Sequence, residues 1–350
     1  MNSPTPASGT RSLVTGATGF LGSHLVDRLL DAGHHVRILV RSPNKAKRWS
    51  PNQVEITAGD VTDPDSLHRA AHDRDVVYHL AAHVSEWGEW QQFERVTVQG
   101  TKNLLDACRR AQVARLVLVS TALVYDDRFA RRARLVTEDA PQLDGDRAYG
   151  YYSKAKVLAE QAAWDAHRVG DIAVSAIRPT WIYGPRDATI LPRLLEHFQG
   201  PLSCWIGRTD PSADPIYVTD VADAAILAAH SPRAAGEAFN ISPTREIRLR
   251  EFLGALFREM NIAPPRLTIP YSIAYAATRC SESWARLTRA KQAPEMTMAG
   301  LACITVDQHV VPTKAQQLLG WSPQVDLDEG ARRTAAWLRD GEPNVSDEQR

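Results

Sequence analysis

The chain has 350 residues, with 41 Lys plus Arg against 41 Asp plus Glu, and therefore a formal net charge of zero. This balance, with no basic stripe that carries interleaved aromatic side chains, argues against a nucleic-acid-binding protein. Four scattered cysteines argue against a disulfide framework and a zinc site, so we expect no metal and a reducing, cytoplasmic location.

The two ends of the chain differ in composition from the rest. Residues 1–10 are rich in Ser, Pro, Thr and Gly and show no secretion signal, and residues 341–350 are polar. We expect both to be tails, the first of them disordered. Between them we expect a nucleotide-binding domain over 11–180 and a smaller lobe over most of 181–340, with some later segments returning to the first domain.

The first expected strand, Ser12–Thr15, leads directly into a turn that contains Gly16, Gly19 and Gly22. Gly16 permits a tight turn, Gly19 lets a phosphate approach the backbone, and Gly22 lets the next helix pack against the strand. That helix, expected over Leu21–Ala32, directs its N–H groups and its positive dipole end at the phosphates. The turn therefore predicts a dinucleotide site, with Thr18, Phe20 and Leu21 as further candidate cofactor-binding residues.

The end of the second expected strand, Val36–Val40, bears on the choice of cofactor. An acidic residue there would bind the ribose diol of NAD and repel a 2′-phosphate. This chain has Arg41, followed by Ser42 and Lys45, which together form a plausible phosphate-binding patch. We therefore favour NADP(H). A solvent-facing Arg41 that tolerates NAD(H) as well is the alternative.

Further strands and helices alternate along the first half of the chain. Most of the expected strands are continuously apolar, as strands covered on both faces are. After Ser12–Thr15 they are Val36–Val40, Val54–Ala58, Val76–Leu80, Leu116–Ser120 and Ala173–Ile177. The expected helices are Leu21–Ala32, Ser66–Ala71, Phe93–Ala111 and Tyr151–Arg168. This alternation predicts an α/β fold with a Rossmann-type doubly wound parallel sheet.

The strand Leu116–Ser120 ends at Thr121, whose hydroxyl group could hydrogen-bond a substrate oxygen. A purely structural role, in which such hydroxyls satisfy backbone groups, is the alternative. On the helix after it, Tyr152 and Lys156 are four residues apart and so lie on one face. An ammonium group near a phenol lowers the pKa of the phenol and makes it a usable acid and base. An ordinary amphipathic helix would show the same spacing.

Beyond Pro179 the pattern becomes irregular, with Pro and Gly at 184–185 and 200–201 and expected helices at Val221–His230 and Arg250–Glu259. We expect this half to form a C-terminal substrate-binding lobe over the carboxyl ends of the strands. No apolar run approaches the roughly 20 residues of a transmembrane helix. The segment Ile269–Ala290 could form an amphipathic helix, which we expect to cover the substrate site or pack on the core, with contact to a membrane as the alternative.

A series of short motifs follows the glycine turn in a fixed order. They are Gly59-Asp60-Val61-Thr62-Asp63, His79-Leu80-Ala81-Ala82, Gly100 to Leu105, Tyr152 with Lys156, Arg178-Pro179, Ile182 to Pro185, Tyr217 to Ala224, Leu319 to Pro323 and Glu329-Gly330. In this order they resemble the extended short-chain dehydrogenase/reductases, over about Ser12 to Leu338. The segment His83 to Gly88 and the long C-terminal part look most like the 3β-hydroxysteroid dehydrogenase and dihydroflavonol reductase branch.

The resemblance implies roles for individual residues. Thr121 would hydrogen-bond the substrate oxygen, Tyr152 would be the acid or base, and Lys156 would tune the pKa of Tyr152 and bind the nicotinamide ribose. The other cofactor contacts that it implies are Asp60 and Val61 at the adenine, Ala81 in the cofactor channel and Pro179 beside the nicotinamide. The chain departs from the family at Thr97, where Asn is usual, and this puts in doubt the helix distortion or water relay that the Asn supports.

The loops expected to border the cleft carry large apolar side chains, with Val84, Trp87 and Trp181 as candidate substrate-binding residues. These features favour an oxidoreductase that reduces a ketone, or oxidises the secondary alcohol, of a hydrophobic small molecule such as a sterol-like, polyketide or long-chain compound. A nucleotide-sugar epimerase or dehydratase with tightly bound NAD is one alternative, and a non-catalytic nucleotide sensor is another. A homodimer through the helices Phe93–Ala111 and Tyr151–Arg168 is one possible assembly.

Overall fold

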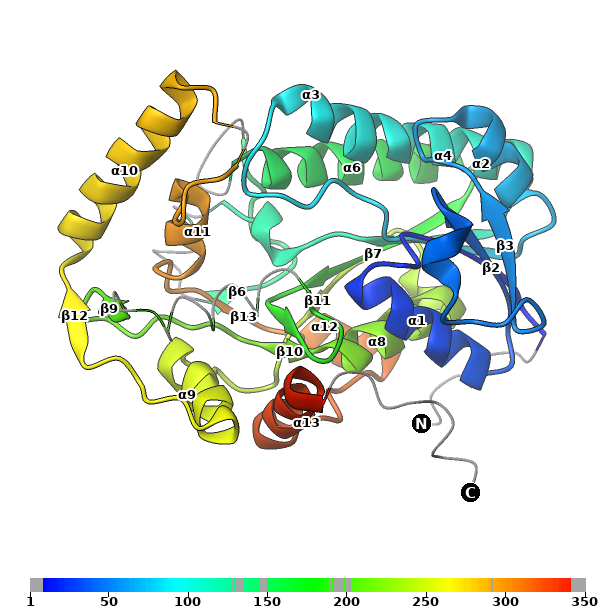
Figure 1. Cartoon of the computed structure of the whole chain (residues 1–350). Helices are drawn as coiled ribbons and strands as arrows, with labels where there is room; N and C mark the ends of the chain where they lie inside the picture. Colours follow the sequence, from blue (N-terminus) through cyan, green and yellow to red (C-terminus); the bar gives the residue numbers. More distant parts are fainter. Residues whose placement is uncertain are drawn as a thin grey trace.

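A seven-stranded, wholly parallel sheet forms the centre of the computed structural model (Figure 1). The structure describes residues 9–126, 129, 135–144, 150–188, 191, 195, 198, 200, 203–290 and 292–340. In spatial order the strands are β11 (Ala238–Ile241), β7 (Ala173–Pro179), β5 (Arg115–Val119), β4 (Val76–His79), β1 (Arg11–Thr15), β2 (His35–Val40) and β3 (Val54–Ala58). Both expected tails lie mainly or wholly outside the described residues.

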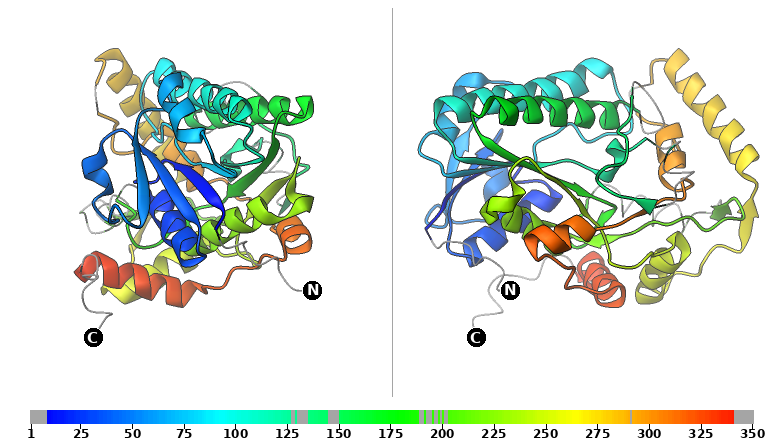
Figure 2. Two further views of the ribbon diagram at one scale, coloured as in Figure 1. Left: turned by 90° about the vertical axis from the view of Figure 1, so that its right-hand side faces the viewer. Right: turned by 180° about the vertical axis from the view of Figure 1, so that it is seen from behind.

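Helices cover both faces of this sheet (Figures 1 and 2). One layer contains α2 (Pro64–Ala71), α4 (Gly100–Arg110) and α6 (Gly150–Val169), and the other contains α1 (Phe20–Asp31), α8 (Val218–His230) and α12 (Thr313–Leu319). Two apolar clusters fill the space between the sheet and these layers, one around Leu25 and Val221, the other around Leu67 and Leu104. The expected α/β doubly wound fold is therefore confirmed.

All six expected strands are present, but the seventh, β11, has no counterpart among them. It comes from the second half of the chain and pairs with β7. The expectation of one regular helix over Phe93–Ala111 is wrong. The structure has a short α3 (Trp90–Phe93), then a π-helix over Glu94–Gln99, and only then α4. A π-helix has a wider turn with i→i+5 hydrogen bonds, which apolar periodicity alone does not reveal.

Several further helices lie beyond the carboxyl ends of the main strands (Figure 1). They include α9 (Leu249–Met260), α10 (Tyr271–Leu287), α11 (Met298–Cys303) and α13 (Leu327–Asp340). Three two-stranded sheets join β10 (Ile216–Tyr217) to β8 (Ile182–Tyr183), β12 (Leu267–Ile269) to β9 (Cys204–Ile206), and β13 (His309–Val310) to β6 (Leu135–Val136). Short 3₁₀-helices span Pro43–Ala46, Ala122–Val124 and Pro232–Ala234. Among the described helices, none combines the length and apolarity needed to cross a bilayer.

Candidate active site

The glycine turn between β1 and α1 is closely packed against the backbone that follows β4. Gly16 has a φ of +74°, and a Cβ on it would lie 2.8 Å from the backbone nitrogen of Ala81. A Cβ on Gly22 would collide with the carbonyl oxygen of Gly16. Only glycine therefore fits at these two positions. Gly19 is the N-cap of α1 and supplies no side-chain cap, so the first turn of the helix presents its backbone N–H groups.

The second part of the turn borders a cavity next to β2. Thr18, Arg41, Ser42 and Lys45 line this cavity, which has a volume of about 400 Å³. Phe20 and Leu21 begin α1 and are half-buried and buried, respectively. Two cationic side chains and two hydroxyl groups therefore border the same cavity. Thr18 comes from the loop between β1 and α1, whereas Arg41 comes from the loop after β2. Such a donor set suits an anion such as a phosphate ester.

Asp60 and Val61 lie at the carboxyl end of β3, where they also have structural partners. The Asp60 carboxylate accepts hydrogen bonds from the backbone nitrogen and the hydroxyl of Thr62, both at 2.8 Å. The Val61 side chain packs closely on Gly100: a Cβ added to Gly100 would lie 2.8 Å from Val61 Cγ2. Val61 is thereby fixed between β3 and α4.

Three candidate catalytic side chains meet where β5 ends. Thr121 caps the following 3₁₀-helix, with its Oγ1 accepting a hydrogen bond from the Leu123 nitrogen at 3.2 Å. Tyr152 and Lys156 extend from α6 toward this point, and Lys156 Nζ lies 6.0 Å from the centre of the Tyr152 ring. Nζ also donates a 2.8 Å hydrogen bond to the Val119 carbonyl, so the ammonium is fixed to the end of β5. The structure thus brings Thr121, Tyr152 and Lys156 together.

The surroundings change the acidity of these groups. The pKa of Tyr152 is not lowered, contrary to what its spacing from Lys156 predicts: burial raises it to about 12, and the Cys303 thiol at the end of α11 acts in the same direction, while the hydrogen bond with Thr121 opposes both. Burial lowers the pKa of Lys156 to about 8, although the carboxylate of Glu160 acts to raise it. At neutral pH the phenol therefore carries its proton and most of the Lys156 side chains are ammonium ions.

A buried ion pair holds α6 in place on the sheet. Arg178 on β7 donates hydrogen bonds to both carboxylate oxygens of Glu160 on α6, at 2.7 and 3.0 Å, and a third to the Tyr125 hydroxyl at 3.0 Å. The Tyr125 hydroxyl in turn donates to Asn240 on β11. Both charged side chains are almost completely inaccessible to solvent. Because Glu160 lies on the same helix as Tyr152 and Lys156, this network fixes the height of that helix over β5 and β7.

A second buried network joins the glycine turn to the π-helix. His79 on β4 contacts the hydroxyl of Thr15 at 2.7 Å through Nδ1 and that of Thr101 at 3.0 Å through Nε2. The Thr101 hydroxyl donates to the carbonyl of Thr97 at 2.6 Å. Burial lowers the pKa of His79 to about 3, so the ring is neutral and acts as a spacer. The helix distortion that was in doubt is present, and the Thr97 hydroxyl accepts a 2.9 Å bond from the His83 nitrogen.

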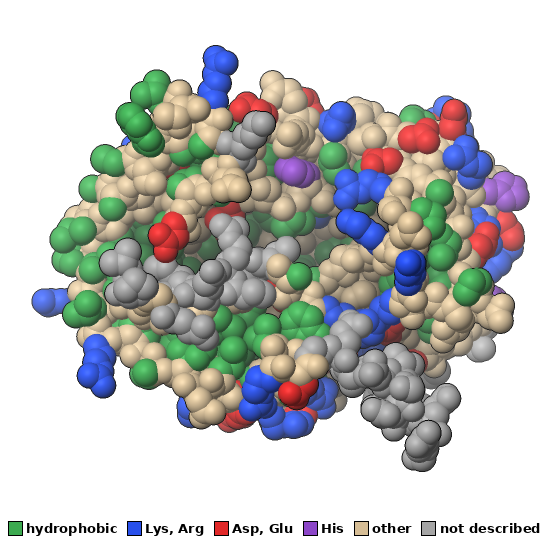
Figure 3. Space-filling view, in the orientation of Figure 1, with side chains coloured by type: hydrophobic (Ala, Val, Ile, Leu, Met, Phe, Trp, Pro, Cys, Tyr) green, Lys and Arg blue, Asp and Glu red, His purple; other side chains and the backbone are tan. Residues whose placement is uncertain are grey.

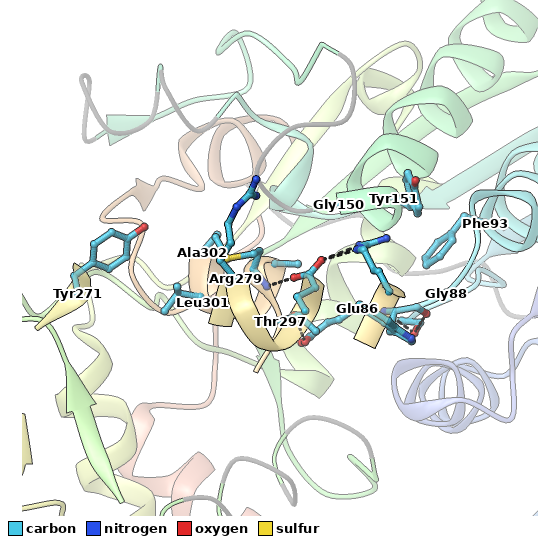
Figure 4. A pocket seen from close by; sticks show the side chains of 16 residues that line it. Glu86, Gly88, Phe93, Gly150, Tyr151, Tyr271, Arg279, Thr297, Leu301 and Ala302 are labelled. Atoms are coloured by element: carbon cyan, nitrogen blue, oxygen red, sulfur yellow. Dashed lines mark hydrogen bonds and ion pairs between the residues drawn. The ribbon is translucent and has the colours of Figure 1, made fainter. Parts of the chain in front are cut away.

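A second cavity, of about 450 Å³, lies between the loop after β4 and the helices α6, α10 and α11 (Figure 4). Phe93 and Tyr151 form one end of it and Tyr271 the other. Trp87 lines the cavity, and its ring is held by a hydrogen bond to the Ala290 carbonyl and by the guanidinium of Arg286, 4.9 Å from the ring centre. Thr121, Tyr152 and Lys156 are not among the residues that line this cavity, whereas Tyr151, the neighbour of Tyr152 on α6, is.

The structure does not bring the other two candidate substrate-binding residues to this cavity. Val84 is 65% exposed and is not among the lining residues. Trp181 is half-buried and packs edge-on against Phe252, with 5.6 Å between the ring centres, at the margin of the apolar cluster around Leu25 and Val221. Pro179 ends β7 and is buried.

Sequence reasoning missed several residues of the cavity. Arg279 and Glu282 on α10 and Thr297 at the start of α11 line it together with Glu86, whose carboxylate accepts a hydrogen bond from the Thr297 hydroxyl at 2.9 Å. They are separated from Glu86 by about two hundred positions, and no local motif marks them. The cap residue Thr297, which accepts from the Gly300 nitrogen, is the one local signal for a helix start there.

Comparisons with known proteins agree with this geometry. The model of the NAD dependent epimerase/dehydratase family matches residues 12–242. A 2-alkyl-3-oxoalkanoate reductase of Shewanella oneidensis is 28% identical over 94% of this chain and 86% of its own length. The decarboxylating sterol-4-alpha-carboxylate 3-dehydrogenase of Mus musculus is 30% identical over 92% and 89%, respectively.

Among solved structures, MoeE5 in complex with UDP-glucuronic acid and NAD superposes with a TM-score of 0.71 at 23% identity, over 94% of this chain and 99% of that one. At this identity the likeness concerns the fold alone. The family match and the two named enzymes go further. The chain belongs to the NAD dependent epimerase/dehydratase family, as an NAD(P)-dependent oxidoreductase of the extended short-chain dehydrogenase/reductases, on their 3β-hydroxysteroid dehydrogenase-like branch.

Proposed function

We propose that the protein is an NADP(H)-dependent oxidoreductase that reduces a ketone, or oxidises the matching secondary alcohol, of a hydrophobic small molecule. The observation that carries the proposal is the convergence of Thr121, Tyr152 and Lys156 at the end of β5, in a chain whose β1–α1 turn only glycine can form. The named activities of the two relatives, a reductase of oxoalkanoates and a sterol dehydrogenase, point the same way.

In this proposal Tyr152 is the proton donor for ketone reduction. Its pKa of about 12 keeps the phenol protonated until a substrate oxygen develops negative charge. Thr121 already accepts the Leu123 N–H, so its own hydroxyl proton is available to a substrate oxygen or to Tyr152. The Lys156 ammonium, 6.0 Å from the centre of the Tyr152 ring, would favour the phenolate that remains after proton transfer.

The bound nicotinamide would supply or accept the hydride. The turn residues Gly16, Thr18, Gly19, Phe20, Leu21 and Gly22, together with Asp60, Val61, Ala81 and Pro179, are the proposed cofactor-binding set. The cavity between Thr18 and Lys45 supports NADP(H), because Arg41 and Lys45 suit a 2′-phosphate and no carboxylate lines that cavity. NAD(H) is the alternative if Arg41 turns to solvent.

The substrate class rests on the cavity beside Tyr151 and on the relatives. Trp87, Phe93 and Tyr271 offer aromatic surface for an apolar body, which supports Trp87 as a substrate-binding residue. A sterol-like, polyketide or long-chain ketone fits this chemistry. The protein is expected to act in the cytoplasm, and a homodimer is one possible assembly.

The test combines thermal unfolding with the absorbance of the reduced nicotinamide. We expect NADPH to stabilise the protein more than NADH does, and to be consumed when hydrophobic ketones are added. A nucleotide-sugar epimerase is the second candidate, because a structure of this fold holds UDP-glucuronic acid and NAD. It would instead be stabilised by UDP-sugars and convert them without net consumption of cofactor. Stabilisation by NADPH with no turnover of either substrate class would indicate a nucleotide sensor.

A further inference from the structure

Lys45 reaches the cavity next to β2 from residues 42–49, which we call the β2 segment. Within it, the backbone nitrogen of Lys45 donates a hydrogen bond to the Ser42 carbonyl at 3.0 Å. A hydrogen bond inside the segment does not fix its place relative to the glycine turn, which supplies Thr18 to the same cavity. The first end of the segment is held by β2, so the contacts at its second end decide where Lys45 lies.

At its second end the β2 segment contacts Asp27 of α1. The indole nitrogen of Trp49 donates a hydrogen bond to Asp27 Oδ1, with 2.7 Å between the two atoms. Arg48 approaches the other oxygen of this carboxylate, with 3.5 Å between its Nε and Asp27 Oδ2. The Trp49 ring is buried in the apolar cluster around Leu25. An indole N–H in such surroundings needs a hydrogen-bond acceptor, and the Asp27 carboxylate supplies it.

A third contact sets the orientation of the Asp27 carboxylate. Arg186, in the loop after β8, donates hydrogen bonds to Asp27 Oδ2 at 2.8 Å and to the Ser23 hydroxyl, one turn earlier on α1, at 3.2 Å. The backbone of Arg186 has a φ of +71°, which is uncommon for a residue with a side chain. Because Arg186 binds Oδ2, Oδ1 is left to face Trp49. The carboxylate thus joins α1, the β2 segment and the loop after β8.

The region around this carboxylate is positively charged. Figure 3 shows Lys and Arg side chains near the middle of one face of the molecule, between α3 and α1. Arg41 and Lys45 line the cavity, whereas Asp27 does not. An acidic residue near a phosphate site is unfavourable by charge alone, since it repels the phosphate. Its presence is explained if Asp27 acts through the segment that it holds.

We propose that Asp27 is a positioning residue for the 2′-phosphate of the cofactor. By binding Trp49 and Arg48 it fixes the β2 segment, so that Lys45 borders the same cavity as Thr18. A binding group that is already held in place loses less freedom when the ligand arrives, and the affinity is higher for that reason. NADH has no 2′-phosphate and gains nothing from a fixed Lys45. This inference rests on the proposed use of NADP(H).

The experiment is calorimetric titration of the full chain and its variants with NADPH and with NADH. We expect Asp27→Ala to weaken NADPH binding by about fivefold or more and to leave NADH binding nearly unchanged. The direction is diagnostic, because loss of a nearby carboxylate would by charge alone strengthen the binding of the more negative cofactor. Asp31→Ala is the matched control, since it removes an exposed carboxylate four residues further along α1 and should change neither affinity.

Two further variants examine the same contact from its other sides. Trp49→Phe removes the indole N–H, keeps an aromatic ring in the cluster and should reproduce the loss of NADPH affinity. The double variant Asp27→Ala/Trp49→Phe should bind NADPH no more weakly than Asp27→Ala does, because both changes remove one hydrogen bond. Asp27→Asn keeps an acceptor for the Trp49 N–H and should retain most of the NADPH affinity.

Thermal unfolding without cofactor shows which variants are folded, and Trp49→Phe provides the test if Asp27→Ala is not. The inference alone is overturned if the unmodified chain prefers NADPH and these variants bind it equally well. An equal loss of affinity for NADPH and NADH also overturns it, because Asp27 would then support α1 as a whole. If the unmodified chain binds both cofactors equally, the proposed use of NADP(H) fails and this inference fails with it.

Discussion

The ammonium of Lys156 donates a hydrogen bond to the backbone carbonyl of Val119, with 2.8 Å between nitrogen and oxygen. The side chain is 4% exposed, and burial lowers its pKa from 10.5 to about 8. A lysine whose pKa is lowered on folding destabilises the native state fully below pH 8, where both states are protonated. The penalty disappears as the pH rises toward 10.5, because the native state then binds fewer protons than the unfolded state.

We therefore expect the unmodified protein to gain stability relative to Lys156→Met as the pH rises from 7 to 10. The lowered pKa of Lys156 corresponds to a change of roughly 3 kcal/mol in the free energy of unfolding between the low-pH and high-pH limits. Urea unfolding of both proteins without cofactor at each pH measures this difference. A difference that stays constant with pH would mean that Lys156 is as well solvated as in the unfolded chain.

Tyr152→Phe should lower ketone turnover by about 10²-fold or more, because it removes the proton donor and leaves the ring in place. Thermal stabilisation by NADPH should persist. Tyr78→Phe is the control, since the buried Tyr78 hydroxyl has no hydrogen-bond partner and the ring lies in β4. Equal turnover in Tyr152→Phe and the control would remove Tyr152 from the mechanism.

Arg41→Ala should weaken NADPH binding by about tenfold or more, which corresponds to the loss of one charge-assisted hydrogen bond. NADH binding should change little, since NADH lacks the 2′-phosphate. Titration of each cofactor by calorimetry gives both constants. Lys47→Ala removes a neighbouring exposed cation that does not line the cavity and should leave both constants unchanged. An equal loss of affinity for NADPH and NADH would show that Arg41 does not bind the 2′-phosphate.

Gly22→Ala should abolish the stabilisation by NADPH, because the new Cβ meets the Gly16 carbonyl and forces the glycine turn to move. Gly254→Ala is the matched control on α9, where the added Cβ would find only Arg258 Nη1, at 4.0 Å. An alanine in that helix should stabilise the protein by about 0.5–1 kcal/mol. Thermal unfolding with and without NADPH separates the two effects. Full NADPH stabilisation in Gly22→Ala would contradict the packing of the turn.

The sequence predicts six strands of the main sheet because most of them are continuously apolar, as parallel strands covered on both faces are. The strand β11 is not predicted from the sequence, because it has only four residues and includes Asn240, whose amide is buried against Tyr125 and Val136. Its place in the sheet depends on pairing with β7, and a local pattern cannot indicate that partner.

The same division applies to the site. Gly16 and the Tyr152/Lys156 pair were found because their spacing is set within one turn or one helix. The contribution of Arg279 and Thr297 was not found, because α10 and α11 reach the cavity only through tertiary packing. Trp87 and Trp181 looked equivalent as aromatic loop residues. The structure separates them by placing Trp181 against Phe252, at the margin of an apolar cluster.

The π-helix over Glu94–Gln99 has a consequence for how this molecule can vary. Its wider turn shifts the helical phase by about 100° between α3 and α4. Phe93 precedes the π-helix and faces Tyr151 and the cavity. Gly100 follows the π-helix, and the Val61 side chain beside β3 packs against it. Substitutions before the π-helix can therefore change the shape of the cavity while the packing of α4 beside β3 is kept. The specificity for the substrate and the specificity for the cofactor can then evolve separately.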